Sequence, residues 1–297
     1  MTWEKRGNIF SPHWSQLPIV DSSDPSYWRI FYSNRVNNKS YPMYFDVEAG
    51  NPSNILYECK SPLLHPGDLG YFDQAGVMPA EIINYKDRKY LFYIGWTNRQ
   101  DVPYHNTIEL AISNDGQEYE KYSLGPVLGT SHKEPGFTGT ISIMVENDIW
   151  RGWYLSCREW KKVGNKVESF YDIKYAESKN GIDWDPKNIT CIPRKNNIAA
   201  ISQSSVIKEG KKYYMWFSHR GHTDYRVKSD SSYKIGLATS LDGIRWDIEG
   251  LNVLPRSEEG WDSDMTAYPY VVIYEGRKFM FYNGNNFGKT GVGYATK

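Results

Sequence analysis

The 297-residue chain is poor in cysteine, has no surplus of either charge and contains no long apolar run. Its three cysteines are too few and too widely spaced to predict a disulfide framework or a zinc knuckle. Thirty-five basic and 35 acidic side chains cancel, which argues against binding to nucleic acid or an anionic membrane, because both need a basic surplus. The longest apolar runs, such as Ile141–Val145, have the length of a strand and are not expected to span a bilayer.

Short catalytic motifs are missing as well. The sequence contains no P-loop, no Rossmann glycine pattern, and neither His-Glu-x-x-His nor Gly-x-Ser-x-Gly. The Met1–Arg6 segment lacks the apolar core of a signal peptide. We therefore expect a cytoplasmic protein whose partners include neither nucleic acid nor a membrane, while the oligomeric state stays open.

Aromatic residues are abundant, at 15% of the chain with 24 Tyr and 11 Trp. Tyr and Trp suit both sheet packing and stacking on sugars. A β-type aromatic run with a polar or cationic tip recurs five times. Aligned at Tyr32, Tyr93, Tyr154, Phe217 and Tyr282, the runs are 61, 61, 63 and 65 residues apart. A fixed period of this kind is typical of a propeller or a solenoid.

Each repeat has the same order of predicted strands. A first strand of small or apolar residues is followed by a short turn, the aromatic second strand and a third strand. An Asn-Gly or Asp-Gly turn, which supplies the positive φ of a tight hairpin, leads to a fourth strand with Tyr119, Trp184 or Trp246. Four antiparallel strands in each repeat predict the blade of a β-propeller.

The last repeat ends after its third strand, at Lys297. The N-terminal segment Trp3–Phe10 resembles the fourth-strand segments Tyr119–Leu128 and Trp246–Leu254. We therefore predict a single all-β domain over residues 1–297, a five-bladed β-propeller with four antiparallel strands per blade. The N-terminal strand would complete the last blade and close the ring, which removes two exposed sheet edges.

In such a meander, the start of the first strand and the end of the second lie on one face of the ring. The Asn-Gly and Asp-Gly turns lie on the opposite face, so we interpret them as structural. Carboxylates, cations and aromatic residues converge on the first face, which is what a site for a polar ligand needs. The segments concerned are 13–18, 68–79, 132–140, 202–205 and 261–268, with the strand tips at Arg35, Trp96, Arg158-Glu159, His219-Arg220 and Asn283–Asn285.

The first-strand segment Gly70–Pro79, with Tyr-Ala-Glu-Ser and Asp-Gly-Ile-x-Trp elements, resembles the five-bladed β-propeller glycosidases. That superfamily includes glycoside hydrolase families 43, 32, 68 and 130, and the chain looks closest to a branch found with bacterial surface-polysaccharide loci. The resemblance implies an axial pocket for a sugar, with carboxylates as acid and base. It implies no cofactor, although some relatives hold calcium in the axial channel. Two segments depart from the pattern, because His13–Pro18 and Ala200–Ser205 contain no carboxylate.

Asp73 is the first candidate for acid/base chemistry, since it precedes the second blade and is expected to face the funnel. Its partner would come from Asp262 and Asp264 or from Glu134. The alternative is that these carboxylates cap turns or lie solvated in loops. His13 is a further candidate acid, because histidine titrates near neutrality.

Arg35, Arg158 and Arg220 occupy equivalent positions at the tips of second strands. Three guanidinium groups facing one funnel predict an anionic ligand, because arginine forms two parallel hydrogen bonds with phosphate. The alternative is that they pair with Asp73, Glu159 and Asp262 to join blades. Further candidate substrate contacts, each with a packing or turn role as its alternative, are Glu159, Tyr171, Gln203, His219, Tyr268, Asn283 and Asn285.

The leading prediction is a carbohydrate-active enzyme with glycosidase-like chemistry at an anomeric centre. Its ligand would be a small sugar bearing phosphate, a nucleotide or a carboxylate, in bacterial polysaccharide metabolism. One alternative is a phosphorylase, transferase or isomerase, for example for pyranose/furanose interconversion, acting on a nucleotide-linked sugar. Another is a sugar-binding propeller without catalysis. The sequence leaves the sugar and its linkage open.

Overall fold

The structure, a computed structural model, describes residues 2–12, 14–194 and 197–297. The regular secondary structure of the described residues is almost entirely β-strand, with one short helical turn, α1 (Asn285–Gly288). The all-β class predicted from the sequence is therefore confirmed. No helix in the described ranges has the length and apolar character needed to cross a membrane.

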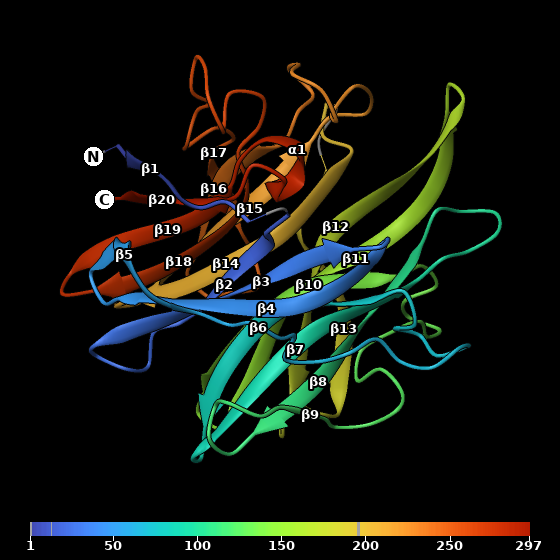
Figure 1. The fold of residues 1–297 in the computed structure, drawn as a ribbon. Coiled ribbons are helices and arrows are strands. Elements are labelled where there is room, and N and C mark those ends of the chain that lie inside the picture. The colour runs from blue at the N-terminus through green and yellow to red at the C-terminus, as the bar shows by residue number, and fades with distance from the viewer. Residues whose placement is uncertain (1, 13, 195–196) are drawn as a thin grey trace.

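The strands form three sheets (Figure 1). One contains β18 (Ala267–Tyr274), β19 (Arg277–Asn283), β20 (Val292–Thr296) and β1 (Glu4–Phe10). The second contains β2 (Gln16–Asp21), β3 (Tyr27–Val36), β4 (Lys39–Glu48), β5 (Asn51–Glu58), β6 (Gly76–Tyr85), β7 (Arg88–Thr97), β8 (His105–Ser113) and β9 (Glu120–Lys121). The third contains β10 (Thr138–Glu146), β11 (Ile149–Val163), β12 (Lys166–Ser178), β13 (Trp184–Ile192), β14 (Ala200–Glu209), β15 (Lys212–Arg220), β16 (Lys234–Ser240) and β17 (Asp247–Gly250).

Each eight-stranded sheet consists of two antiparallel four-stranded meanders. A single parallel bridge joins the two meanders, Ser40 to Gly76 in one sheet and Tyr171 to Ala200 in the other. Within every meander the strands pair in chain order, first to second, second to third and third to fourth. The strand order predicted for a repeat is therefore present, and we refer to each four-stranded group as a unit.

The two ends of the chain lie side by side (Figure 1). Strand β1 pairs with β20 in an antiparallel register that runs from Glu4 opposite Thr296 to Phe10 opposite Val292.

The first strands contact one another in chain order, β2 with β6, β6 with β10, β10 with β14 and β14 with β18. Strand β18 in turn contacts β2.

Aromatic residues of the second strands fill the space between units. Trp28 of β3 packs edge-on against Phe279 and Phe281 of β19, with ring centroids 5.0 Å and 6.1 Å apart. Trp153 of β11 meets Trp246 of the next unit at 6.1 Å. Burying a side chain of this kind contributes roughly 1.5–3 kcal/mol, so most of the aromatic surplus stabilises the sheets.

Every first strand is interrupted by a bulge at the same place. The register against the second strand shifts between Gln16 and Ile19, Pro79 and Glu81, Thr138 and Ile141, Ser202 and Ser204, and Ala267 and Tyr270. Bulges bend a strand and redirect its side chains, and they are frequent beside functional sites. All five first strands therefore bend, and change the direction of their side chains, at corresponding positions.

Three bulge residues adopt a positive φ although they are not glycine, Leu17 at 58°, Gln203 at 42° and Tyr268 at 55°. This conformation costs of order 1–3 kcal/mol and needs support from its surroundings. Their backbone N–H groups donate to side chains of other units, at 2.9 Å for Leu17, 2.9 Å for Gln203 and 2.7 Å for Tyr268. Contacts between units thus hold the bulges in place.

Candidate functional site

The bulged first strands line a cavity of about 370 Å³, which we call the central cavity. All five first strands contribute to its wall, with Leu17, Met78, Thr140, Ser202 and Tyr268 as examples. Most of the remaining wall residues are aromatic, polar or cationic. It consists of Gln16, Arg35, Ser40, Ile94, Trp96, Asn98, Pro103, Tyr104, Asn106, Phe137, Gly139, Leu155, Tyr171, Arg220, Tyr225, Arg226, Tyr233 and Phe287.

The described lining carries a positive charge, from Arg35, Arg220 and Arg226, and includes neither Asp nor Glu. Arg226 is neutralised by Glu168 of β12, to which it donates two hydrogen bonds of 2.5 Å and 3.1 Å. Within residues 2–12, 14–194 and 197–297, neither Arg35 nor Arg220 forms an ion pair. The cavity therefore presents two cations without a carboxylate partner.

Arg220 is the more unusual of the two, because its side chain is only 1% exposed. Its guanidinium donates to the backbone oxygens of Ser169 at 2.6 Å and Gly221 at 3.1 Å, and lies 3.8 Å from the centre of the Tyr225 ring. Its Nε is buried without a hydrogen-bond partner in the described part of the chain. A buried charge normally has a partner of opposite charge, so this group is suited to an anion entering the cavity.

Phenols complete this side of the cavity. The hydroxyls of Tyr171 and Tyr233 lie 2.6 Å apart, and that of Tyr104 lies 3.1 Å from Ser169 Oγ. Burial raises the pKa of Tyr104, Tyr233 and Tyr268, so these hydroxyls stay protonated at neutral pH. The arrangement offers flat apolar faces and neutral polar groups next to a guanidinium, as a sugar with a charged substituent requires.

Of the site residues predicted from the sequence, the structure brings four together in the central cavity. Arg35, Tyr171, Arg220 and Tyr268 all line it, and they come from four different units. Trp96, predicted as a strand tip on the same face, also lines it. Arg158, by contrast, is exposed and absent from the described lining, so the three equivalent arginines do not converge.

The predicted catalytic carboxylates Asp73, Glu134 and Asp262 are not among the lining residues. Each is at most 2% exposed and pairs with a lysine at 2.6 Å, Asp73 with Lys121, Glu134 with Lys174 and Asp262 with Lys5. A second-strand tyrosine accompanies each pair. Tyr154 donates to Glu134 at 2.8 Å and Tyr282 to Asp262 at 2.9 Å, while burial and the nearby Asp73 raise the pKa of Tyr93.

These three clusters join the segment before a first strand to later strands of the same unit. Lys5 and Lys121 lie on the fourth strands β1 and β9, and Lys174 lies on the third strand β12. The alternative predicted from the sequence was that arginines pair with Asp73 and Asp262. In the structure lysines form these pairs instead. A signal for two of the lysines was present in the sequence, since Lys5 and Lys121 each follow an aromatic residue and a glutamate.

Asp264 does not form an acidic pair with Asp262. Its backbone N–H donates to Asn285 Oδ1 at 2.7 Å, and its backbone oxygen accepts from Arg256 at 3.2 Å. Asn285 also donates to the Gly260 oxygen at 3.0 Å, so it secures this loop. His13, the remaining candidate acid, lies outside the described residues.

The other predicted contacts also lie outside the described lining of the central cavity. Glu159 pairs with Lys161 at 2.9 Å, and this contact holds the pKa of Glu159 below its usual range. His219 Nε2 donates to the Leu251 oxygen at 2.6 Å, and burial lowers the pKa of His219. Gln203 is fully buried at its bulge, and neither polar atom of its amide has a partner in the described ranges.

Asn283 connects the first and last units. Its Oδ1 accepts from the Leu17 N–H at 2.9 Å, and its Nδ2 donates to the backbone oxygens of Ser15 at 2.7 Å and Gly291 at 2.8 Å. All three hydrogen bonds are buried. The side chain therefore holds β2 and the segment before β20 against β19, instead of contacting a ligand in the cavity.

Sequence reasoning missed Glu168 and the tyrosines of the segment between β15 and β16. That segment is long and contributes Tyr225, Arg226 and Tyr233 to the wall. Glu168 holds it in place, because Tyr225 and Arg226 both donate to this carboxylate. The signal was the extra length of the segment together with its aromatic residues.

In the described part of the chain, no group of three or more His, Cys, Asp or Glu side chains is suited to a metal, and calcium in the channel stays a prediction.

The arrangement of strands is shared with glycoside hydrolases. A solved glycoside hydrolase aligns over 99% of this chain and 91% of its own, with a TM-score of 0.76 and 17% identity. A thermostable family-43 glycoside hydrolase aligns over 95% and 87%, with a TM-score of 0.70 and 18% identity. The GH32 β-fructofuranosidase BmSUC1 of Bombyx mori aligns over 97% and 61%, with a TM-score of 0.69 and 16% identity. The chain thus has the fold of the β-propeller glycosidases, as its sequence resemblance implied.

Two bacterial relatives are closer in sequence. Uncharacterized protein MT1551 of Mycobacterium tuberculosis strain CDC 1551 and uncharacterized protein Rv1502 of strain H37Rv are each 32% identical to this chain over 309 aligned residues. Each alignment covers 99% of this chain and 99% of the relative. The chain belongs to the family of these two proteins. No protein-family model matches it.

Proposed function

We propose that this protein is a carbohydrate-active protein that binds a small anionic sugar in the central cavity. The observation that carries the proposal is Arg220, a buried guanidinium in the cavity wall with which no carboxylate in the described chain forms an ion pair, although Glu168 is close enough to interact with its charge. A phosphate or carboxylate on the ligand would supply the missing negative charge. The cavity volume, about 370 Å³, lies at the lower end of the range for small-molecule sites, which suits one sugar with its charged group.

Arg35 and Trp96 support the same ligand from other strands. The Arg35 guanidinium lies 5.5 Å from the centre of the Trp96 ring, and both residues line the cavity. An indole presents a flat apolar face, and guanidinium groups bind the oxygens of phosphate in pairs. A sugar bearing phosphate, a nucleotide or a carboxylate would use both kinds of group.

We further propose that the units form one closed ring of five blades around the cavity. Three observations support this arrangement: the pairing of β1 with β20, the contact between β18 and β2, and the hydrogen bonds of Asn283 to the segment around β2. A closed ring would place the bulges of all first strands around one axis. The cavity would then be the axial pocket that the sequence predicts.

The reaction we propose is phosphorolysis, group transfer or isomerisation of a phosphate- or nucleotide-linked sugar. In this assignment Arg220 holds the phosphate, and the hydroxyls of Tyr171 and Tyr268 form hydrogen bonds with sugar oxygens. Hydrolysis with Asp73, Glu134 or Asp262 has less support, since each carboxylate is already held by a lysine. Bacterial polysaccharide metabolism, where such sugars are donors, is the proposed setting.

Thermal unfolding with matched ligands tests the proposal. A panel of sugar 1-phosphates and nucleoside diphosphate sugars is compared with the corresponding neutral sugars and with inorganic phosphate. A ligand at about 100 times its Kd stabilises the native state by about 2.7 kcal/mol, so a binding sugar phosphate should raise the Tm clearly. Products are followed by phosphorus NMR, which reports cleavage or transfer at the phosphate.

Arg220→Gln should abolish the stabilisation by the anionic sugars. Arg158→Gln is the matched control, because Arg158 lies on the second strand of its own unit, β11, but is exposed and outside the described lining. The control variant should bind like the wild type. Equal stabilisation by neutral and anionic sugars, or full binding by Arg220→Gln, would contradict the proposal.

A further inference from the structure

A second pocket, with a volume of about 410 Å³, adjoins the central cavity. The two share Asn98, which lines both. We call this second site the outer pocket. Its wall consists of Gly70, Tyr71, Phe72, Thr97, Asn98, Arg99, His105, Thr107, Pro126 and Thr130.

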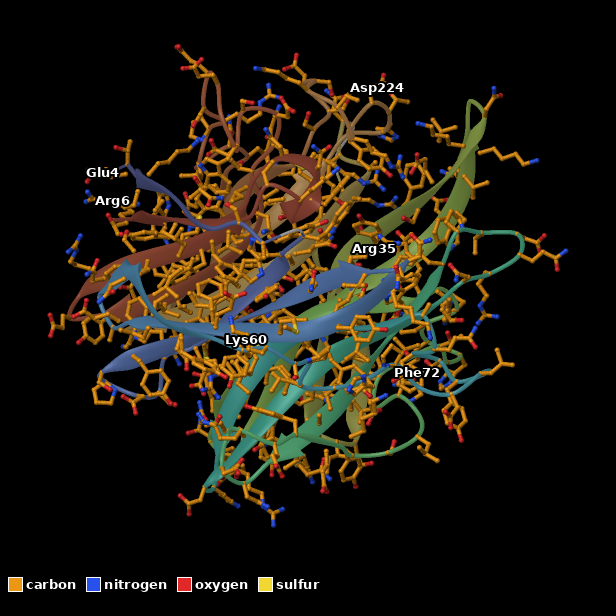
Figure 2. The ribbon with its side chains drawn as sticks, in the orientation of Figure 1. Glu4, Arg6, Arg35, Lys60, Phe72 and Asp224 are labelled. Atoms are coloured by element: carbon orange, nitrogen blue, oxygen red, sulfur yellow. The ribbon has the colours of Figure 1, made fainter. Side chains whose placement is uncertain are left out.

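The outer pocket is built from segments that hydrogen bonds hold in place. Gln74 links the loop before β6 to the end of β7, because it accepts from the Gly70 N–H at 2.6 Å and donates to Thr97 Oγ1 at 2.9 Å. Phe72 packs against Gly95 of β7 so closely that a Cβ there would lie 2.2 Å from its ring. Figure 2 marks Phe72 in this loop, on the side of the molecule where β3 ends near Arg35.

Thr107 gives the outer pocket an unpaired polar group. It lines the pocket at 4% exposure, and its Oγ1 is buried without a hydrogen-bond partner in the described chain. Leaving a buried hydroxyl unpaired costs about 1–3 kcal/mol. A ligand hydroxyl in the pocket would supply the missing partner.

Apart from Arg99, which is exposed to solvent, the remaining groups suit an uncharged, hydroxyl-rich ligand. Tyr71 is 38% exposed and offers a ring face for stacking, and the His105 ring lies 3.0 Å from the Thr130 hydroxyl. Burial, together with Arg99, lowers the pKa of His105, so its imidazole is neutral at neutral pH. Neutral donors and acceptors beside an aromatic face are typical of saccharide sites.

We propose that the outer pocket binds a second, neutral sugar residue of the ligand. The ligand would then be an anionic disaccharide, with its charged residue in the central cavity and its linkage passing Asn98. This inference rests on the proposed function, because the charged residue must occupy the central cavity. The nucleoside of a nucleotide sugar is the competing occupant that the test separates.

The test compares Kd values for monosaccharide phosphates, for disaccharides that carry the same phosphorylated residue, and for nucleoside diphosphate sugars. Calorimetry on the full chain should show at least one phosphorylated disaccharide binding about tenfold more tightly than its monosaccharide. Thr107→Val should weaken binding of the disaccharide about fivefold, the loss expected for one hydrogen bond, and leave monosaccharide binding unchanged. The unliganded variant should unfold at the wild-type temperature or above, because the hydroxyl it loses has no partner.

Tyr71→Ala should also weaken only the disaccharide, while Tyr122→Ala, at an exposed tyrosine outside the described wall of the outer pocket, should change neither ligand. The inference is overturned if no disaccharide in the panel binds more tightly than its monosaccharide, or if Thr107→Val weakens both equally. It is also overturned if the two variants weaken only nucleotide sugars. Failure of every anionic sugar to bind, monosaccharides included, would instead refute the proposed function itself.

Discussion

The buried pair of Glu134 and Lys174 allows a direct test of what this carboxylate does. Lys174 Nζ lies 2.6 Å from Glu134 Oε1, and the two side chains are 2% and 1% exposed. The hydroxyls of Tyr154 and Ser156 also donate to the carboxylate. Lys174→Met keeps most of the aliphatic side chain and removes the ammonium, which leaves Glu134 buried with only hydroxyl partners.

The expected cost is large. Removing one member of a buried ion pair destabilises a protein by about 3–5 kcal/mol, because the other charge stays buried without compensation. At roughly 2–4 °C per kcal/mol, the Tm of the Lys174→Met variant should fall by roughly 6–20 °C. The double variant Glu134→Gln/Lys174→Met removes both charges, so its loss should be smaller than the sum of the single losses.

Circular dichroism during heating, with urea unfolding as a second measurement, would report these changes. Lys187→Met is the matched control, since Lys187 forms an exposed pair with Asp185 at 2.9 Å and should melt within about 2 °C of the wild type. The structural role assigned to Glu134 is refuted if Lys174→Met melts like the wild type or if the single losses add. A Glu134→Gln variant with wild-type stability and no turnover would return Glu134 to the role of catalytic acid.

Two further predictions concern pH and the junction of the first and last units. Burial raises the pKa of Glu81 and of Glu109 to about 7 each, above the usual 4.5. Between pH 4.5 and pH 7 these two carboxyl groups are therefore protonated in the folded protein and ionised in the unfolded chain. The contribution of the protonated groups to the free energy of unfolding is therefore fully present below pH 4.5. It is lost as the pH rises through 7, by up to about 3 kcal/mol for each group. Urea unfolding between pH 5 and pH 8 should show this decline, and Glu81→Gln should reduce its slope; an unchanged slope would contradict the assignment. Asn283→Ala removes three buried hydrogen bonds and should cost about 3 kcal/mol in urea unfolding, and a loss below about 0.5 kcal/mol would show that Asn283 does not hold the junction.

Much of the fold could be predicted because its signals are local and repeated. The spacing of Tyr32, Tyr93, Tyr154, Phe217 and Tyr282 marked equivalent second strands, and the Asn-Gly and Asp-Gly turns marked the hairpins. The match of the N-terminal segment to a fourth strand predicted that β1 pairs with β20, which the structure shows. The bulges were not predicted, because they depend on contacts between neighbouring units.

The site was harder to predict, because the partner of a charge depends on packing between distant segments. Asp73 and Asp262 were correctly placed before first strands. The shared aromatic-Glu-Lys sequence marks Lys121 and Lys5 as equivalent residues, but it does not show that these lysines reach the two carboxylates. Arg158 and Arg220 occupy equivalent positions in the repeat, yet one is exposed and the other is buried in the cavity wall. The register of β11 against β12 shifts at Arg158, between Cys157 and Glu159, whereas β15 pairs with β16 without a shift and Tyr225 packs over Arg220.

The pairing of β1 with β20 has a consequence for how the molecule is made. Strand β1 is synthesised before every other strand of the described chain, and its partner β20 is synthesised after all of them. This sheet therefore cannot be completed until β20 has been made, whereas each eight-stranded sheet consists of a contiguous stretch of chain. Until then β1 has no partner strand, and an unpaired strand edge is prone to associate with other chains.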